Sequence, residues 1–281
     1  MKTTLLKKII KNALAEDIGK GDITTFATLT EKTSGSGEFL VKQDGVIAGL
    51  EVLETLFKIG SAELEFVKYL EDGSRVSNGQ IAAGITGNAA DMLTLERTAL
   101  NFLQRMSGIA TMTALFVEQV KHTKVKILDT RKTVPGLREL DKLAVKIGGG
   151  TNHRIGLYDM FLIKDNHIAV AGSVTKAIKA CQEFKSKNNL AAKIEVETTN
   201  LDEVAEALAC LPDFIMLDNF NINEMSKAVK IIGGKCLVEA SGGIDMNTIR
   251  EIAETGVDFI SVGALTHSVK ALDISLEIKT I

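Results

Sequence analysis

The sequence predicts an α/β fold in which an N-terminal α+β domain is followed along the chain by an α/β barrel. This barrel has six strands, fewer than the eight of a complete barrel. From Lys124 onward, short apolar β-branched runs alternate with helical stretches, as βα units around a parallel sheet do. Later runs end at nearly equal intervals, at Glu197, Asp218, Ser241 and Gly263, which fits one strand, one loop and one helix per unit. Neither a G-x-G-x-x-G after the first strand nor a P-loop motif occurs, which removes the main support for the open nucleotide-binding folds.

The N-terminal part, up to about Ser107, has an irregular pattern that is typical of a mixed domain. The expected elements are a helix over 7–15, hairpin strands over 35–49, a helix over 51–59, and a strand with a following turn over 63–76. A long helix over 88–106 follows, with Leu93, Leu100 and Leu103 on its apolar face and Arg97 in its middle. We therefore expect an N-terminal domain over 1–107, a barrel over 108–267, and a segment 268–281 that packs on the N-terminal domain.

Six apolar runs predict the strands of the barrel. They cover 124–130, 160–166, 193–198, 214–219, 236–241 and 259–264. Each run ends in polar or very small residues, although a strand buried on both faces should be apolar throughout. Because the carboxyl ends of barrel strands meet on one face, these residues predict a site there.

Composition and charge exclude several classes of partner. The chain has 281 residues, a formal net charge of −3 and a pI near 5.9, so its overall charge does not attract nucleic acid or anionic membranes. Its apolar runs are shorter than a membrane span. The three cysteines have no metal-ligand spacing, so we expect free thiols and a cytoplasmic location.

Cationic and acidic residues gather at the predicted strand ends. Arg131 and Lys132 follow the first run, Lys164 follows the second, Glu197 ends the third and Asp218 ends the fourth. A single such Asp is usually a helix cap and a single Lys is usually solvated, but six strand ends together favour function. Glu195 shares a strand face with Glu197, where two carboxylates need cations or metal as partners.

Two glycine-containing segments predict anion binding. Between the first two strands, Gly148–Arg154 reads GGGTNHR, in which backbone N–H groups, His153 and Arg154 could reach a ligand; the alternative is a helix C-cap and an exposed turn. Ser241, Gly242, Gly243 and Gly263 follow the last two strands, where many barrels bind phosphate. His267 could contribute or could be a surface residue without a role.

Several motifs, in order along nearly the whole chain, resemble the quinolinate phosphoribosyltransferase family. They are EDIGKGDITT (16–25), ERTALN (96–101), DTRKT (129–133), GGGTNHR (148–154), KDNH (164–167), EVE (195–197), LDN (217–219) and EASGGI (239–244). The resemblance implies an N-terminal open-faced α/β sandwich joined to a six-stranded incomplete barrel. It also implies the reaction of quinolinate with phosphoribosyl pyrophosphate to give nicotinate mononucleotide, pyrophosphate and carbon dioxide in NAD biosynthesis.

The resemblance further implies a role for each site residue. Arg131, His153, Arg154 and Lys164 would hold the quinolinate carboxylates, next to Thr130, with Lys132 shared with the ribosyl donor. Glu197 and Asp218 would hold Mg²⁺ and the ribose hydroxyls. Ser241, Gly242, Gly243 and Gly263 would hold the 5′-phosphate. Lys132, Lys164, Glu197 and Asp218 would be the catalytic groups, and Arg97 would reach the site of a neighbouring subunit, which implies at least a homodimer.

Four alternatives stay open at this point. A barrel aldolase would use Lys164 as a Schiff base. A related phosphoribosyltransferase would act on nicotinate or another pyridine and would need fewer cations. A molybdenum-associated relative of the same fold and a non-catalytic sensor barrel are the others. The sequence also leaves open whether Arg105 or Lys146 enters the site or supports the helices.

Overall fold

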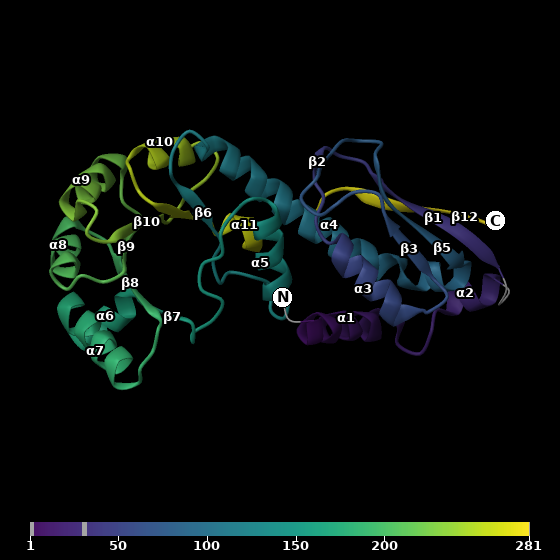
Figure 1. Cartoon of the computed structure of the whole chain (residues 1–281), viewed down its shortest axis with the longest axis horizontal. Coiled ribbons are helices and arrows are strands. Elements are labelled where there is room, and N and C mark those ends of the chain that lie inside the picture. The colour runs from purple at the N-terminus through teal and green to yellow at the C-terminus, as the bar shows by residue number, and fades with distance from the viewer. Residues whose placement is uncertain (1–2, 30–32, 281) are drawn as a thin grey trace. The chain divides into compact units, whose positions relative to one another are not determined.

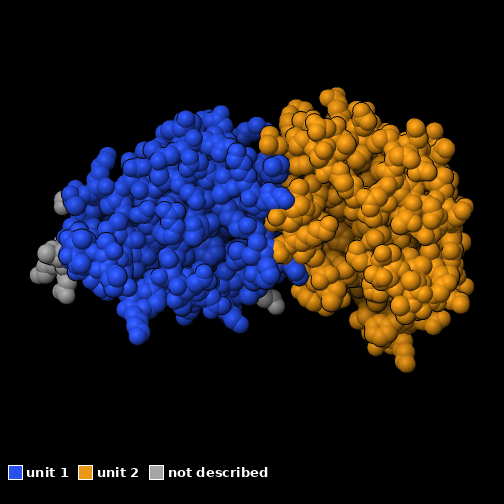
Figure 2. Space-filling view, turned by 180° about the vertical axis from the view of Figure 1, so that it is seen from behind, with its two compact units in different colours: residues 1–114, 134–149, 268–281 blue, residues 115–133, 150–267 orange. Residues whose placement is uncertain are grey.

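The computed structural model describes residues 3–29 and 33–280. The chain divides into two compact units (Figure 2): residues 1–114, 134–149 and 268–281 form the first, and residues 115–133 and 150–267 form the second. A domain boundary after residue 107 stays a prediction.

The first unit is built on a four-stranded antiparallel sheet in the order β12-β1-β5-β3 (Figure 1). Its strands are β1 (Ser34–Val41), β3 (Glu65–Lys68), β5 (Ile81–Asn88) and β12 (Ile274–Thr280), and a separate pair joins β2 (Gly45–Val46) to β4 (Arg75–Val76). Its helices are α1 (Thr3–Ile18), α2 (Ile23–Thr28), α3 (Leu50–Gly60) and α5 (Arg138–Ile147), while α4 (Ala89–Val120) begins here and ends in the second unit.

The sheet of the first unit buries one face. Along β1, buried residues alternate with partly exposed ones, so every second side chain faces the helices. Phe39 of β1 packs against Phe57 of α3, with ring centroids 6.1 Å apart, and both contact Phe66 of β3. This one-sided burial is the open-faced sandwich that the sequence predicts, so that part of the fold class is confirmed.

Two details of the predicted N-terminal elements are wrong. Residues 35–49 do not form a hairpin, because β1 pairs with β12 and β5, which are distant in sequence, and β2 pairs with β4. The long helix continues to Val120, and Leu93 on it is exposed. Gly108 marks a close contact and not a helix end, since a Cβ there would lie 2.2 Å from the Lys270 carbonyl oxygen.

The second unit is a parallel six-stranded sheet in the order β6-β11-β10-β9-β8-β7, which leaves β6 and β7 at its edges among the described residues. The strands are β6 (Lys126–Leu128), β7 (Met160–Ile163), β8 (Lys193–Thr198), β9 (Phe214–Asp218), β10 (Leu237–Ser241) and β11 (Phe259–Ser261). Each of the six predicted runs contains one of them. The incomplete α/β barrel is therefore confirmed.

Helices connect the strands of the second unit from β7 to β11 and lie on the outer side of the curved sheet (Figure 1). They are α6 (Asp165–Ala171), α7 (Val174–Lys187), α8 (Leu201–Ala209), α9 (Ile222–Ile232) and α10 (Ile249–Glu254), and the short α11 (Ala264–His267) follows β11. Ser173, Asn200 and Asn221 begin α7, α8 and α9 as N-caps, each accepting a backbone N–H three residues on. The Asn200 and Asn221 caps lie within three residues of the ends of β8 and β9, which keeps these two strand loops short.

Arg105 supports the helices of the first unit. Its Nε and Nη2 donate to the two carboxylate oxygens of Asp141 at 2.9 and 2.8 Å, which joins α4 to α5. Asp141 is fully buried, so this bidentate pair replaces the hydration that the carboxylate loses on folding.

Replacing Asp141 with alanine should lower the free energy of unfolding by about 3 kcal/mol, because the Arg105 guanidinium loses its buried partner. Urea denaturation of the two proteins measures the difference. As a control, Arg250→Ala removes an exposed pair with Glu254 and should change stability by less than about 0.5 kcal/mol. Equal effects of the two substitutions would mean that the Arg105–Asp141 pair is not a significant tie.

Candidate active site

A cavity of about 770 Å³ lies at the carboxyl ends of the strands in the second unit. Every strand of the sheet contributes to its wall, either with its last residues or with the loop that follows. The lining residues are Asp129, Thr130, Arg131, Lys132, His153, Arg154, Leu162, Lys164, Glu197, Met216, Asp218, Asn219, Glu239, Ser241, Gly242, Gly243, Ile244, Ser261, Gly263, Ala264 and His267.

Every predicted site residue except Arg97 lines this cavity. The parallel register explains the convergence, since Ser241 of β10 lies beside Asp218 of β9, and Glu197 of β8 lies beside Met216 of β9. Arg97 is an exposed residue of α4, in the first unit. The roles of these residues stay predictions.

Lys164 and Glu197 form an ion pair inside the cavity. The Lys164 Nζ lies 2.7 Å from Glu197 Oε2, and the Glu197 side chain is largely buried. The ion pair engages the Lys164 Nζ with a carboxylate, whereas a Schiff-base lysine needs its Nζ free to attack a substrate carbonyl. The contact therefore argues against the aldolase alternative.

The two guanidinium groups of the cavity lie close to one another. Burial lowers the pKa of the Arg154 guanidinium, and the charge of Arg131 beside it lowers that pKa further. Arg154 Nη1 donates to the Met160 carbonyl oxygen at 3.2 Å, but its buried Nε has no hydrogen-bond partner. A buried guanidinium with an unused donor, next to a second, half-buried guanidinium, is suited to a dianionic ligand.

His153 lies between the cavity and two buried glutamates. Its Nε2 is 2.8 Å from Glu195 Oε2 and 3.5 Å from Glu239 Oε2, and its Nδ1 accepts the backbone N–H of Arg154 at 2.7 Å. Burial raises the pKa of Glu195 to about 7 and that of Glu239 well above its usual value. Sequence reasoning missed Glu239 as a site residue, although its place two residues before Ser241 on the same strand face was a usable signal.

The glycines after β10 permit a close approach of two strand ends. Gly242 has a φ of +92°, and a Cβ there would lie 2.2 Å from Asn219 Oδ1 and 2.8 Å from the Asn219 backbone nitrogen. Asn219 itself has a positive φ of 58°. Only glycine fits position 242 without moving the loop that follows Asp218.

Gly242→Ala should therefore raise the KM for a phosphate-bearing substrate by about tenfold or more, because the added methyl group displaces both loops. Steady-state kinetics with that substrate varied measures the change. Gly234→Ala is the matched control, because Gly234 also has a positive φ but has open space around its Cβ position, and it should leave KM unchanged. A normal KM in Gly242→Ala would remove this loop from phosphate binding.

Gly148 does not have the predicted ligand-facing role. It is the C-cap of α5, and a Cβ there would lie 2.4 Å from the Ala110 carbonyl oxygen of α4. Neither Gly148 nor Gly149 lines the cavity. The helix C-cap alternative is correct for Gly148, which ends α5 and also lies against α4.

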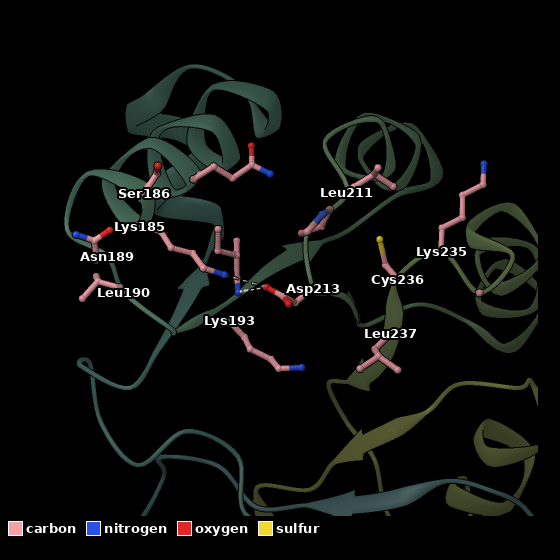
Figure 3. A pocket seen from close by; sticks show the side chains of 14 residues that line it. Lys185, Ser186, Asn189, Leu190, Lys193, Leu211, Asp213, Lys235, Cys236 and Leu237 are labelled. Atoms are coloured by element: carbon pink, nitrogen blue, oxygen red, sulfur yellow. Dashed lines mark hydrogen bonds and ion pairs between the residues drawn. The ribbon is translucent and has the colours of Figure 1, made fainter.

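A second hollow, of about 790 Å³, lies at the opposite, amino ends of β8, β9 and β10 (Figure 3). The carboxylate of Asp213 in this hollow already has partners within the protein, because it accepts the Ile194 N–H at 2.8 Å and pairs with Lys185 at 3.8 Å. Lys193 and Lys235 point away from Asp213 (Figure 3). The two hollows have similar volumes, so the convergent charges and buried unsatisfied atoms, and not size, identify the first as the candidate active site.

Family models match nearly the whole chain. The model described as quinolinate phosphoribosyl transferase, N-terminal domain, matches residues 22–107, and the C-terminal domain model matches residues 109–277. The chain belongs to the quinolinate phosphoribosyltransferase family.

Relatives of this family align with the chain from end to end. A protein of Nicotiana tabacum named quinolinate phosphoribosyltransferase [decarboxylating] 2b, mitochondrial, is 44% identical over 98% of this chain and 82% of its own length. One of Bacillus subtilis, named probable nicotinate-nucleotide pyrophosphorylase [carboxylating], is 41% identical over 97% and 93%. The crystal structure of NadC from Streptococcus pyogenes covers 100% of this chain and 99% of its own, with a TM-score of 0.94 and 39% identity.

Glu197 and Asp218 fit the magnesium ion that membership of the quinolinate phosphoribosyltransferase family implies. They are carboxylates at the ends of adjacent strands and line the same cavity. Magnesium in phosphate-transfer sites usually takes one or two carboxylates, with substrate phosphates and water completing its shell. The donor set therefore has the right chemistry.

Among the described residues, no helix is long and apolar enough to span a bilayer.

Proposed function

We propose that this protein transfers the phosphoribosyl group of phosphoribosyl pyrophosphate to quinolinate, with loss of carbon dioxide, to give nicotinate mononucleotide and pyrophosphate in NAD biosynthesis. The observation that supports this most strongly is the pair of neighbouring guanidinium groups, the half-buried Arg131 and the buried Arg154, in one cavity with the Lys164–Glu197 pair. Family membership and the names of the relatives support the same reaction.

The cationic side of the cavity would bind quinolinate. Arg131, Arg154 and Lys164 offer two planar forks and one point charge, which match two carboxylates on neighbouring ring carbons. A pyridine with a single carboxylate would leave at least one of these three cations without a substrate carboxylate. The loss of that charge-assisted contact makes this side favour quinolinate over nicotinate.

The acidic side would bind the ribosyl donor. Glu197 and Asp218 would accept hydrogen bonds from ribose hydroxyls and stabilise the positive charge that develops on the ribose as pyrophosphate leaves. Lys132 would contact the pyrophosphate, and Ser241, Gly242, Gly243 and Gly263 the 5′-phosphate. Bound Mg²⁺, held by Glu197 and Asp218, would offset charge on the leaving group.

The chemistry needs no protein nucleophile. The pyridine nitrogen attacks the ribose carbon as its bond to pyrophosphate breaks. When the adjacent carboxylate then leaves as carbon dioxide, the pyridinium stabilises the electron pair that stays on the ring carbon, and this carbon takes up a proton from water. The protein orients the two substrates and pairs their charges. Lys164, held by Glu197, would lie between the two substrates and restrain the quinolinate carboxylate.

We further propose a homodimer or larger assembly in which Arg97 completes the site of the partner subunit. Arg97 is exposed on α4 although its neighbours Thr98, Ala99 and Leu100 are buried, so its side chain is available to another chain. A cytoplasmic location is also a proposal. The plant relatives carry names that place those proteins in mitochondria or chloroplasts.

Separate assays of the two substrates test the proposed reaction against its nearest alternative. With phosphoribosyl pyrophosphate and Mg²⁺, kcat/KM for quinolinate should exceed that for nicotinate by about a thousandfold or more, because nicotinate lacks the second carboxylate for the cationic side of the cavity. Chromatographic detection of nicotinate mononucleotide measures both. A preference for nicotinate would instead support the related phosphoribosyltransferase.

A further inference from the structure

Four polar side chains meet at the wall of the cavity. Glu195 of β8 and Glu239 of β10 are 0% and 1% exposed; His153 contacts both of them, and Ser261 of β11 contacts Glu239. The ligand atoms of His153, Glu195 and Glu239 all lie within 4.8 Å of one another. Burying two carboxyls this close together has a large energetic cost unless their charge is reduced.

The hydrogen bonds fix the role of the imidazole. His153 Nδ1 accepts the backbone N–H of Arg154, so the ring proton is on Nε2 and points to Glu195 Oε2 at 2.8 Å. Both ring nitrogens are thus used within the protein. The ring connects the buried carboxyls to the backbone of Arg154, one of the two guanidinium residues of the cavity.

The contacts also divide the two carboxyls by charge. The facing oxygens of Glu195 and Glu239 lie within 4.8 Å of each other and both side chains are buried, so two ionised carboxylates there would repel strongly and one carboxyl keeps its proton. Glu195 receives the His153 N–H and faces the positive charges of Arg154 and Lys164 as well as the negative charge of Glu197. Glu239 lies farther from His153 and contacts the neutral Ser261 hydroxyl. Glu239 has fewer positive charges around it than Glu195, so Glu239 is the carboxyl that retains the proton.

We propose that Glu239 is a positioning residue held as a neutral carboxylic acid, which donates to Glu195 and so keeps one buried carboxylate against His153 and Arg154. On the proposed function, this arrangement fixes the Arg154 fork for the substrate carboxylate, and His153 acts through Arg154 and does not itself bind quinolinate. Burial raises the pKa of Glu239 strongly, in keeping with this state.

Two substitutions at position 239 test the proposal. Glutamine has nearly the shape of a neutral carboxylic acid and, like it, can both donate and accept hydrogen bonds, so Glu239→Gln should keep KM and kcat within about threefold of the unmodified enzyme. Glu239→Leu has similar volume but no donor, and should raise the KM for quinolinate by about tenfold or more while leaving the KM for phosphoribosyl pyrophosphate unchanged. Equal impairment by both substitutions would overturn the proposal, because it would mean that the charge of Glu239 is required.

Infrared spectroscopy of the free protein tests the proton without any substrate. A carboxylic-acid C=O band at neutral pH should be present in the unmodified protein and missing in Glu239→Gln. A missing band in the unmodified protein would contradict the proposal, and would be expected if a divalent cation bound His153 and both glutamates.

If Glu239→Leu does not fold, the infrared band and the thermal stability of Glu239→Gln decide the question. Failure of Glu239→Gln to fold overturns the proposal. Lack of quinolinate turnover in the unmodified enzyme would refute the proposed function but leave these two measurements valid.

Discussion

Lys164→Ala is expected to lower kcat by about a thousandfold or more while leaving the protein folded, because it removes the point charge beside Glu197 that would restrain the substrate carboxylate. The fold should survive because the Lys164 side chain is 46% exposed and its ion pair with Glu197 lies at the cavity surface. Steady-state kinetics and circular dichroism of the purified variant measure both effects.

Lys235→Ala is the matched control for this substitution. Lys235 is an exposed lysine of the same unit that lines the hollow at the opposite ends of the strands. It should leave kcat and KM unchanged, which separates the local effect of Lys164 from a general loss of positive charge. Near-normal activity of Lys164→Ala would exclude Lys164 from the catalytic groups.

Arg97→Ala is expected to lower kcat/KM for quinolinate by about a hundredfold, since the substrate loses a charge-assisted contact from the partner subunit. The sharper result comes from mixing subunits of Arg97→Ala with subunits of Lys164→Ala. In a mixed dimer, one site carries both changes and the other carries neither. Random mixing should then restore roughly a quarter of the normal activity, because half the dimers each contain one intact site.

This complementation distinguishes action within one subunit from action between two. If Arg97 serves the site of its own subunit, every site in the mixed dimer keeps one defect and no activity returns. Each variant mixed with itself, through the same dissociation and reassembly, provides the control. Light scattering before and after mixing checks that the assembly has reformed.

The barrel and most of its site could be predicted because they follow from local patterns. Parallel strands buried on both faces give continuous apolar runs, and their carboxyl ends must meet, so Lys164, Glu197 and Asp218 could be placed together without a structure. The same logic located Ser241 to Gly243 on the same face of the barrel. These conclusions depend only on the alternation of strand and helix along the chain.

Features that depend on distant pairing could not be predicted in this way. The alternation of β1 suggested a hairpin, yet its partners β12 and β5 come from other parts of the chain. Gly148 looked like part of a ligand loop because its contact with Ala110 is invisible in the sequence. Glu239 was not identified as a site residue from the sequence, because its contacts with Ser261 and His153 depend on residues that are distant along the chain.

Carbon dioxide release from quinolinate labelled in the carboxylate next to the ring nitrogen tests the central claim most directly. The account predicts release that requires the protein, phosphoribosyl pyrophosphate and Mg²⁺ together, in one-to-one ratio with nicotinate mononucleotide, and that is lost in Lys164→Ala. Release without phosphoribosyl pyrophosphate, or mononucleotide formed with both carboxylates retained, would contradict it.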